Sequence, residues 1–379
     1  MKSIYLDHAA TTPVHPDVVE AMVPVYQETF GNPSSVHQFG RKARSILDKA
    51  RRQAASSLNA DEKEIVFTSG GTEADNLAVI GTARANKAKG SHIITTSIEH
   101  HATLHAVEFL ETEGFDVTYL PVDENGLVQL EDIKQALRED TILVSIMMVN
   151  NETGAVQPIA ETAELLKDHQ AYFHSDIVQA YGLMEMDVKE LGVDLLAVSG
   201  HKINGPKGVG FLYVKEGTVL SSQQYGGEQE RKRRAGTENV PAVRGLQAAI
   251  EVMEAERSTY QEKYLHYKRS FIQTLKDQEV AFEVNGKEET TAASIVNISF
   301  TGMNVETLLT NFDLSGIAAS SGSACTAGSV EPSHVLTAMF GTGHPKTTNS
   351  IRFSFGLANN EDDVIEAAEK ISQIIKRLA

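Results

Sequence analysis

A lysine at the end of an apolar run is the first residue of this chain whose surroundings suggest chemistry. Lys202 closes the sequence Ser-Gly-His-Lys (199–202), between the apolar runs 195–198 and 209–214. Partial burial between two such strands lowers the pKa of a lysine and frees its lone pair, as an imine-forming nucleophile requires. A solvated lysine in a turn is the simpler alternative, and Lys207 is the second candidate for the reactive lysine. Other residues must therefore decide whether Lys202 is the reactive lysine.

A glycine turn at residues 69–72 has the chemistry of an anion site. A strand-like run precedes it, and a helical pattern follows from Gly71 and Thr72. Glycines let an anion approach the backbone, and the first N–H groups of a helix point at that anion. The alternative is a tight turn with Thr72 as a helix cap and with Glu73 and Asp75 favouring the helix dipole. No Gly-Lys-Ser or Gly-Lys-Thr follows, so this is not a Walker-type loop.

The single cysteine, Cys325, lies in a segment built almost entirely of Gly, Ala, Ser and Thr (residues 320–329). No bulky apolar side chain would anchor this segment, so we expect it to be mobile and its thiol to be reactive rather than a core filler. One cysteine cannot form an intrachain disulfide, which fits a reducing compartment.

Strand and helix patterns alternate over residues 64–215, which predicts a mostly parallel sheet with helices on both faces. Ligands of such sheets lie beyond the carboxyl ends of the strands. Polar side chains gather at those predicted ends, namely Thr72, His100, Asn151, Asp176, Gln179, Ser199, His201 and Lys202. Their convergence supports a site more strongly than any single motif does.

Helical spacing of apolar residues continues from Val243 to Leu275, and a helix of that length would cross from one domain into another. We therefore predict an α/β fold with two domains. The large domain would cover residues 15–255, and a smaller α+β domain would cover residues 1–14 and 256–379.

Besides short strands in the opening residues and at 317–319, two longer strands are predicted in the smaller domain. Residues 293–300 alternate like a half-buried strand, and residues 350–356 form a strand that carries Arg352. Partial burial of that arginine would require a carboxylate or phosphate partner.

The composition, 41% hydrophobic and 22% charged, is that of a soluble globular protein. A net charge of −17 argues against a surface that binds nucleic acid. No apolar run reaches the roughly 18 residues of a membrane span, and the N-terminus lacks the pattern of a signal peptide. We expect a cytoplasmic protein. The basic run 231–234 is either a solvated loop or a local site for an anion or a partner.

The predicted groups together match the needs of pyridoxal 5'-phosphate. That cofactor binds a lysine as an imine and needs an anion cradle for its phosphate and an acid beside its ring nitrogen. Asp176 would keep the ring nitrogen protonated, His100 could stack on the ring, and Gln179 could bind the ring oxygen. We predict no metal site.

The chain resembles the cysteine desulfurases of the NifS/IscS type, members of the class-V aminotransferase family with the aspartate-aminotransferase-like fold of type I pyridoxal-phosphate enzymes. The resemblance covers nearly the whole chain. It rests on six segments in order: Gly-Asn-Pro-Ser-Ser (31–35), Thr-Ser-Gly-Gly-Thr-Glu-Ala-Asp-Asn (68–76), Asn-Asn-Glu (150–152), Ser-Gly-His-Lys (199–202), Arg-Ala-Gly-Thr (234–237) and Ser-Ser-Gly-Ser-Ala-Cys (320–325). The chain departs from the family at Ser175 and Ile177, where Val and Ala are expected, and it lacks the longer C-terminal tail of some members.

The resemblance implies a role for each matched residue. Lys202 would form the imine with the cofactor and move protons, while Cys325 would take the sulfur of L-cysteine as a persulfide and L-alanine would leave. The other implied contacts are Gly71, Thr72, Ser199 and His201 with the phosphate, Thr237 with the phosphate of the other subunit of a homodimer, Asp176 and Gln179 with the ring, His100 stacked on the ring and assisting proton transfer, Asn151 beside the ring, and Arg352 with the substrate carboxylate.

The implied partner is a sulfur-acceptor protein, either a scaffold for iron–sulfur cluster assembly or a tRNA-thiolating enzyme. We expect no direct contact with nucleic acid or membrane. A selenocysteine lyase or an aminotransferase on the same fold is the alternative within enzymes. A non-catalytic phosphate-binding protein with a redox-sensing cysteine is the alternative of a different class.

Overall fold

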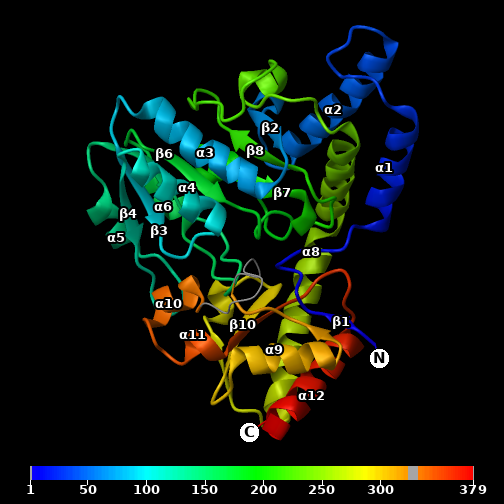
Figure 1. Ribbon diagram of the computed structural model, residues 1–379, viewed down its shortest axis with the longest axis vertical. Coiled ribbons are helices and arrows are strands. Elements are labelled where there is room, and N and C mark those ends of the chain that lie inside the picture. Colours follow the sequence, from blue (N-terminus) through cyan, green and yellow to red (C-terminus); the bar gives the residue numbers. More distant parts are fainter. Residues whose placement is uncertain (1, 323–331, 379) are drawn as a thin grey trace.

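A computed structural model of the chain describes residues 2–322 and 332–378 (Figure 1). Its centre is a seven-stranded sheet in which all neighbours pair in parallel except β8, which is antiparallel to both β2 and β7. In spatial order the strands are β2 (Ile65–Thr68), β8 (Gly210–Val214), β7 (Leu195–Ser199), β6 (Tyr172–Asp176), β5 (Thr141–Ser145), β3 (His92–Thr96) and β4 (Asp116–Leu120). The predicted α/β class with a mostly parallel sheet is confirmed.

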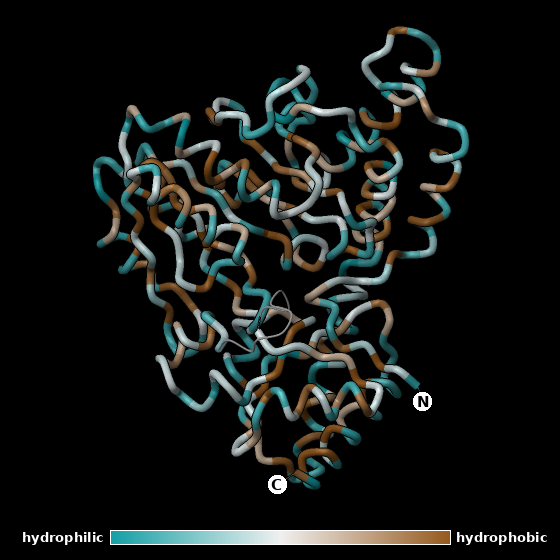
Figure 2. Tube along the Cα trace, in the orientation of Figure 1, coloured by the Kyte–Doolittle hydropathy of each residue, from teal (hydrophilic) through white to brown (hydrophobic). Residues whose placement is uncertain are grey.

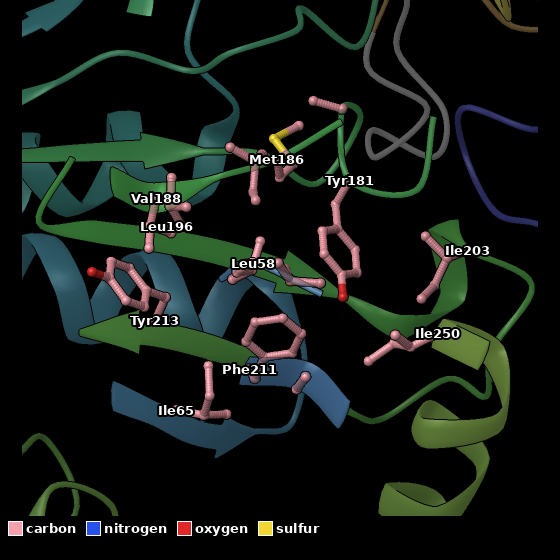
Figure 3. Packing of buried hydrophobic residues seen from close by; sticks show 14 of the residues in the cluster. Leu58, Ile65, Tyr181, Met186, Val188, Leu196, Ile203, Phe211, Tyr213 and Ile250 are labelled. Atoms are coloured by element: carbon pink, nitrogen blue, oxygen red, sulfur yellow. The ribbon is translucent and has the colours of Figure 1, made fainter. Parts of the chain in front are cut away.

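Helices cover both faces of this sheet, because successive strand residues face opposite cores. Leu196 and Phe211 join the core that Figure 3 shows, together with Leu58 and Ile250 from the helical layer. Leu195 faces the opposite side, where it packs in a smaller cluster with residues of α3. The helices of this part are α1 (Pro16–Glu28), α2 (Gln38–Ser56), α3 (Gly71–Asn86), α4 (His101–Thr112), α5 (Leu130–Ala136), α6 (Ile159–Leu166) and α7 (Val188–Leu191).

A three-stranded antiparallel sheet, ordered β12-β10-β9, organises the rest of the chain. Its strands are β9 (Phe282–Asn285), β10 (Ile295–Phe300) and β12 (Ser350–Ser354), and a two-residue β1 (Ile4–Tyr5) pairs in parallel with β11 (Ile317–Ala318). Around them lie α9 (Val305–Leu314), α10 (His334–Phe340), α11 (Lys346–Asn349) and α12 (Glu361–Leu378). Apolar and hydrophilic residues alternate along α12 (Figure 2), whose apolar side is buried in a second core.

The strand predicted within residues 293–300 is present as β10, but the prediction that it is half-buried is wrong. All six residues of β10 are buried. Its apolar side belongs to the second core, and its polar side is also covered, because the Asn297 amide donates to the Glu152 carbonyl and Ser299 donates to Asn349. The alternation is present in the sequence, but both faces are inside the protein.

The long helix predicted beyond Val243 is α8 (Val240–Asp277), and it runs from one core to the other (Figure 1). Leu246 and Ile250 pack in the first core, while Tyr264 and Phe271 pack in the second. None of the helices in the described part of the chain is both long and apolar enough to cross a membrane.

Candidate functional site

A cavity of about 260 Å³ lies at the carboxyl ends of the central strands. It gathers side chains from segments that are far apart in the sequence. Ten predicted site residues line it: Gly71, Thr72, His100, Asn151, Asp176, Gln179, Ser199, His201, Lys202 and Arg352. Five residues that sequence reasoning did not assign to a site line it as well: Ala9, Ala10, Asp75, Met147 and Val178.

The glycine turn before α3 forms the anion-binding end of this cavity. Gly70 has a φ of +152°, and a Cβ on Gly71 would lie 2.9 Å from a methyl group of Val178. Helix α3 begins without a side-chain cap, so its first N–H groups are available to a ligand. The residues Thr72 and Ser199 line the same end. This arrangement suits a phosphate group.

Asp176 is the last residue of β6, and its carboxyl group is only 4% exposed within the cavity wall. Burial raises its pKa to about 6, against the opposing effects of the Val178 N–H, which donates at 2.8 Å, and of nearby Lys202. A buried carboxylate needs a cationic partner, and a protonated ring nitrogen is one. An anion cradle, a buried acid and a lysine in one cavity fit pyridoxal phosphate.

Lys202 lies in a short 3₁₀ turn between β7 and β8, and its Nζ lines the cavity. The ammonium donates to the carbonyl oxygens of Ala9 and Ala10, the latter at 2.9 Å. Lys207 is exposed and lies outside the cavity lining. Of the two candidate lysines, the geometry therefore favours Lys202.

Two histidines of the cavity are neutral at neutral pH. Burial, aided by nearby Lys202, lowers the pKa of both His100 and His201 to about 4. His100 caps α4, where its Nδ1 accepts the Ala102 N–H at 3.1 Å, and the Nδ1 of His201 lies 3.1 Å from the Thr11 hydroxyl. A neutral His100 whose Nδ1 accepts a backbone N–H carries its proton on Nε2, and it can donate that proton or present its ring face.

Arg352 has the carboxylate partner that its sequence context requires. The side chain is 2% exposed, its Nη2 donates to Asp7 at 2.7 Å, and its Nη1 donates to the Asn151 carbonyl at 2.9 Å. Its Nε is buried and has no hydrogen-bond partner within residues 2–322 and 332–378. Since a guanidinium has five N–H donors, Arg352 still has donors for a substrate carboxylate at the cavity wall.

Gln179 and Asn151 complete the wall. The Gln179 amide donates to the Ala9 carbonyl at 2.9 Å, which leaves its second N–H and its oxygen for a ligand. The departures at Ser175 and Ile177 are both fully buried, while Asp176 and Gln179 still reach the cavity.

One of the predicted site residues that the structure describes does not line this cavity. Thr237 is exposed and does not line it. Cys325 lies within 323–331, outside the described residues. The basic run before Thr237 is only partly solvated, because Arg234 forms a 2.7 Å ion pair with Glu73.

Asp75 is a cavity residue that the sequence pattern did not identify. It was interpreted as an acid favouring the helix dipole, but it is 1% exposed and lines the cavity. Possible ligand atoms of Asp75, His100 and Asp176 all lie within 4.8 Å of one another. This spacing suits a cation, and the protonated ring nitrogen is the cation that the rest of the cavity fits.

Comparison with known proteins places this geometry in context. A model of the family described as aminotransferase class-V matches residues 4–366. A Bacillus subtilis protein is 58% identical over 378 residues, covering 100% of both chains. A protein of Methanosarcina thermophila named cysteine desulfurase IscS is 48% identical over 377 residues, covering 100% of this chain and 93% of that one.

Solved structures agree with these relatives. A NifS-like protein matches with a TM-score of 0.93 at 34% identity, over 99% of this chain and 100% of that one. A structure described as SspA in complex with cysteine matches with a TM-score of 0.83 at 35% identity, over 93% of this chain and 99% of that one.

Proposed function

Because the chain belongs to the aminotransferase class-V family, we propose that it is a pyridoxal-phosphate-dependent cysteine desulfurase in which Cys325 receives the sulfur. It would convert L-cysteine to L-alanine and keep the sulfur as a persulfide. The observation that carries this proposal is the single cavity that combines Lys202, Asp176, the glycine turn and Arg352.

The residues of the cavity divide into those that hold the cofactor and those that act on the substrate. When bound, pyridoxal phosphate supplies an aldehyde that forms an imine with an amino group and a ring that accepts electrons from Cα. The proposed contacts are Gly71, Thr72, Ser199 and His201 with the phosphate, Asp176 with the ring nitrogen, Gln179 with the ring oxygen, and His100 with the ring face.

Arg352, Asn151 and Lys202 would orient the substrate and move its protons. The free donors of Arg352 bind the substrate carboxylate, and Asn151 lies beside it, joined to Arg352 through its carbonyl. With the substrate bound, the Lys202 amine would carry a proton to and from Cα. Neutral His100 would assist proton transfer through its Nε2–H, because its Nδ1 accepts the Ala102 N–H.

Cys325 is proposed as the nucleophile toward sulfur. Its thiolate attacks the sulfur of the bound cysteine, so an S–S bond forms while the Cβ–S bond breaks. The electron pair left on the substrate is taken up with protons, and L-alanine leaves. The described flanks of the cysteine segment support this role, since Gly322 and Ser333 both lie against Glu152, next to cavity residue Asn151.

The proposal is tested with holoenzyme and L-cysteine. Wild-type protein should release alanine and carry a persulfide on Cys325, found by mass spectrometry after alkylation. Cys325→Ser should bind the cofactor and L-cysteine with unchanged affinity but form no persulfide. A Cys325→Ser variant that still yields sulfide and alanine at the wild-type rate overturns the assignment.

We further propose that the protein is a homodimer. The first two helices and their connection expose six large apolar side chains, which a second copy would cover: Val19, Val23, Tyr26, Phe30, Val36 and Phe39. Thr237, exposed and outside the cavity of its own chain, would then bind the phosphate in the partner's cavity. Light scattering should give twice the chain mass. Thr237→Ala should lower the affinity for the cofactor. A monomeric protein that binds the cofactor with full affinity would contradict the proposed dimer.

The persulfide needs an acceptor, which we propose is a scaffold for iron–sulfur cluster assembly or a tRNA-thiolating enzyme in the cytoplasm. We also propose the division into a large domain (15–255) and a small domain (1–14 and 256–379). It is supported by the two cores that meet along α8.

A further inference from the structure

Asp75 is a second buried carboxyl group beside the cofactor's acidic partner. It projects from α3, whereas Asp176 ends β6, and both line the same cavity. The side chain of Asp75 is 1% exposed, and its Oδ1 has no hydrogen-bond partner among the described residues. A carboxyl oxygen so deeply buried and unpartnered points to a function beyond folding.

His174, which lies next to Asp75, is not a cation and therefore cannot neutralise an ionised Asp75. The Nε2 of His174 lies 3.4 Å from the Asp75 Oδ1, yet both atoms lack a well-directed hydrogen bond. The Nδ1 of His174 is 2.8 Å from the Ser145 hydroxyl. His174 is fully buried, and burial lowers its pKa to about 3, so its ring stays neutral.

The charges around Asp75 decide which of the two acids is ionised. Burial raises the pKa of Asp75 well above its usual range, and the carboxyl groups of Asp176 and Glu99 raise it further. Lys202 favours the ionised form of Asp176 instead. Among the described residues, His100 also faces the pair, and its ring is neutral. Two neighbouring buried carboxyls with one cation retain one proton between them.

We propose that Asp75 is a positioning residue for the cofactor: it stays protonated and donates its hydrogen to Asp176, which keeps the ionised oxygen of Asp176 directed at the ring nitrogen. This inference rests on the proposed cofactor site and deepens it. Asp176 already accepts the Val178 N–H at one oxygen, so a second donor would fix the carboxylate plane. Ring protonation would then depend on the pair rather than on Asp176 alone.

Two substitutions separate a hydrogen-bond donor from a negative charge at this position. Asp75→Asn keeps an N–H that can donate to Asp176 but cannot ionise. Asp75→Leu has the same branched shape with larger methyl groups and has no donor. Apoprotein of each variant is titrated with pyridoxal phosphate, and binding is followed by absorbance from pH 6 to 9. Asp176→Asn serves as the control that removes the acidic partner itself.

We expect Asp75→Asn to bind within about threefold of wild type across this range. Asp75→Leu should bind tenfold or more weakly, and its affinity should fall as pH decreases, because Asp176 without a donor takes up a proton more easily. The melting temperatures of the apoproteins, measured in parallel, show whether Asp75→Leu is folded. If Asp75→Leu is not folded, the comparison of Asp75→Asn with wild type and Asp176→Asn still shows whether position 75 needs a donor or a charge.

Three results overturn the proposal. Loss of affinity in Asp75→Asn equal to that in Asp176→Asn would mean that the charge of Asp75 is needed. Wild-type affinity in a folded Asp75→Leu would mean that Asp75 has no role. One divalent cation retained per wild-type apoprotein and absent from Asp75→Asn would mean that the pair binds a metal. None of these depends on Cys325, so failure of the proposed sulfur chemistry remains distinguishable.

Discussion

Two regions beside the cavity, which we call the sheet wall and the second wall, are built on different principles. On one wall, Asp176 and the turn that carries Lys202 follow directly from strands β6 and β7 of the central sheet, and each strand is fixed by neighbours on both sides. The second wall lies outside the cavity lining, next to Asn151, where Gly322 and Ser333 flank the cysteine segment and both lie against Glu152. The sheet positions many groups at once, whereas one carboxyl group positions both flanks.

Glu152 has the features expected of such an anchor. It is fully buried, its Oε2 accepts the Ser333 hydroxyl at 2.5 Å, and its Oε1 has no hydrogen-bond partner in the described part of the chain. Gly322 has a φ of +55°, and a Cβ there would lie 3.3 Å from the Glu152 Oε2. Burial raises the pKa of Glu152, and His334 and Arg352 oppose that rise.

The largest effect is expected on the sheet wall, from Lys202→Ala. Loss of the imine-forming amine and of the proton carrier should lower turnover by at least about 10²–10⁴-fold. Borohydride reduction followed by peptide mapping should find the cofactor on Lys202 in wild type and on no lysine in the variant. Lys207→Ala is the matched control and should keep the labelled Lys202. Label found at Lys207 contradicts the assignment.

A smaller effect is expected where the two walls meet, from Arg352→Gln. Charge-assisted hydrogen bonds contribute about 1.5–3 kcal/mol, so kcat/KM for L-cysteine should fall about 10–100-fold. Cysteamine lacks the carboxylate, so its turnover should change much less than that of L-cysteine. A proportional loss for both substrates would instead indicate that Asp7, left without its buried partner, distorts the site.

Glu152→Gln and Ser333→Ala test the second wall by itself. Both remove or weaken the anchor of the flanks, so we expect persulfide formation on Cys325 to slow about tenfold, as loss of about 1.4 kcal/mol in positioning would produce. The affinity for pyridoxal phosphate should not change, because neither side chain lines the cavity. Rapid quenching and persulfide quantification measure the step. Weakened cofactor binding would show that the walls are not independent.

The contrast between the walls also explains what the sequence could predict. Lys202 and Asp176 were predictable because strand–helix alternation brings the ends of parallel strands together. The partnership of Arg352 with Asp7 spans 345 positions, and no local pattern indicates it. Asp75 resembles an ordinary acid near the start of a helix, and only the packing of α3 against β6 reveals its burial.

The smallest effect is expected from Glu99, a buried acid of the sheet wall, on the pH dependence of the stability of the apoprotein. One oxygen of Glu99 accepts from Thr96 and Met147, the other has no hydrogen-bond partner in the described chain, and burial raises the pKa from 4.5 to about 8. The folded state therefore binds one more proton than the unfolded state between these values. Stability should fall as pH rises through this window, with a slope of up to about 1.4 kcal/mol per pH unit.

Buried His100 has the opposite dependence, because its pKa falls from 6.5 to about 4, and stability from that source is lost only as pH decreases below 6.5. Of these two groups, only Glu99 should therefore change the stability between pH 6.5 and 8. Glu99→Gln cannot titrate, so urea unfolding of the apoprotein should show a flatter pH profile than wild type in that range. Equal slopes in the two proteins would mean that the buried Glu99 is already ionised. The sheet wall would then hold a buried negative charge that no cation in its described surroundings compensates.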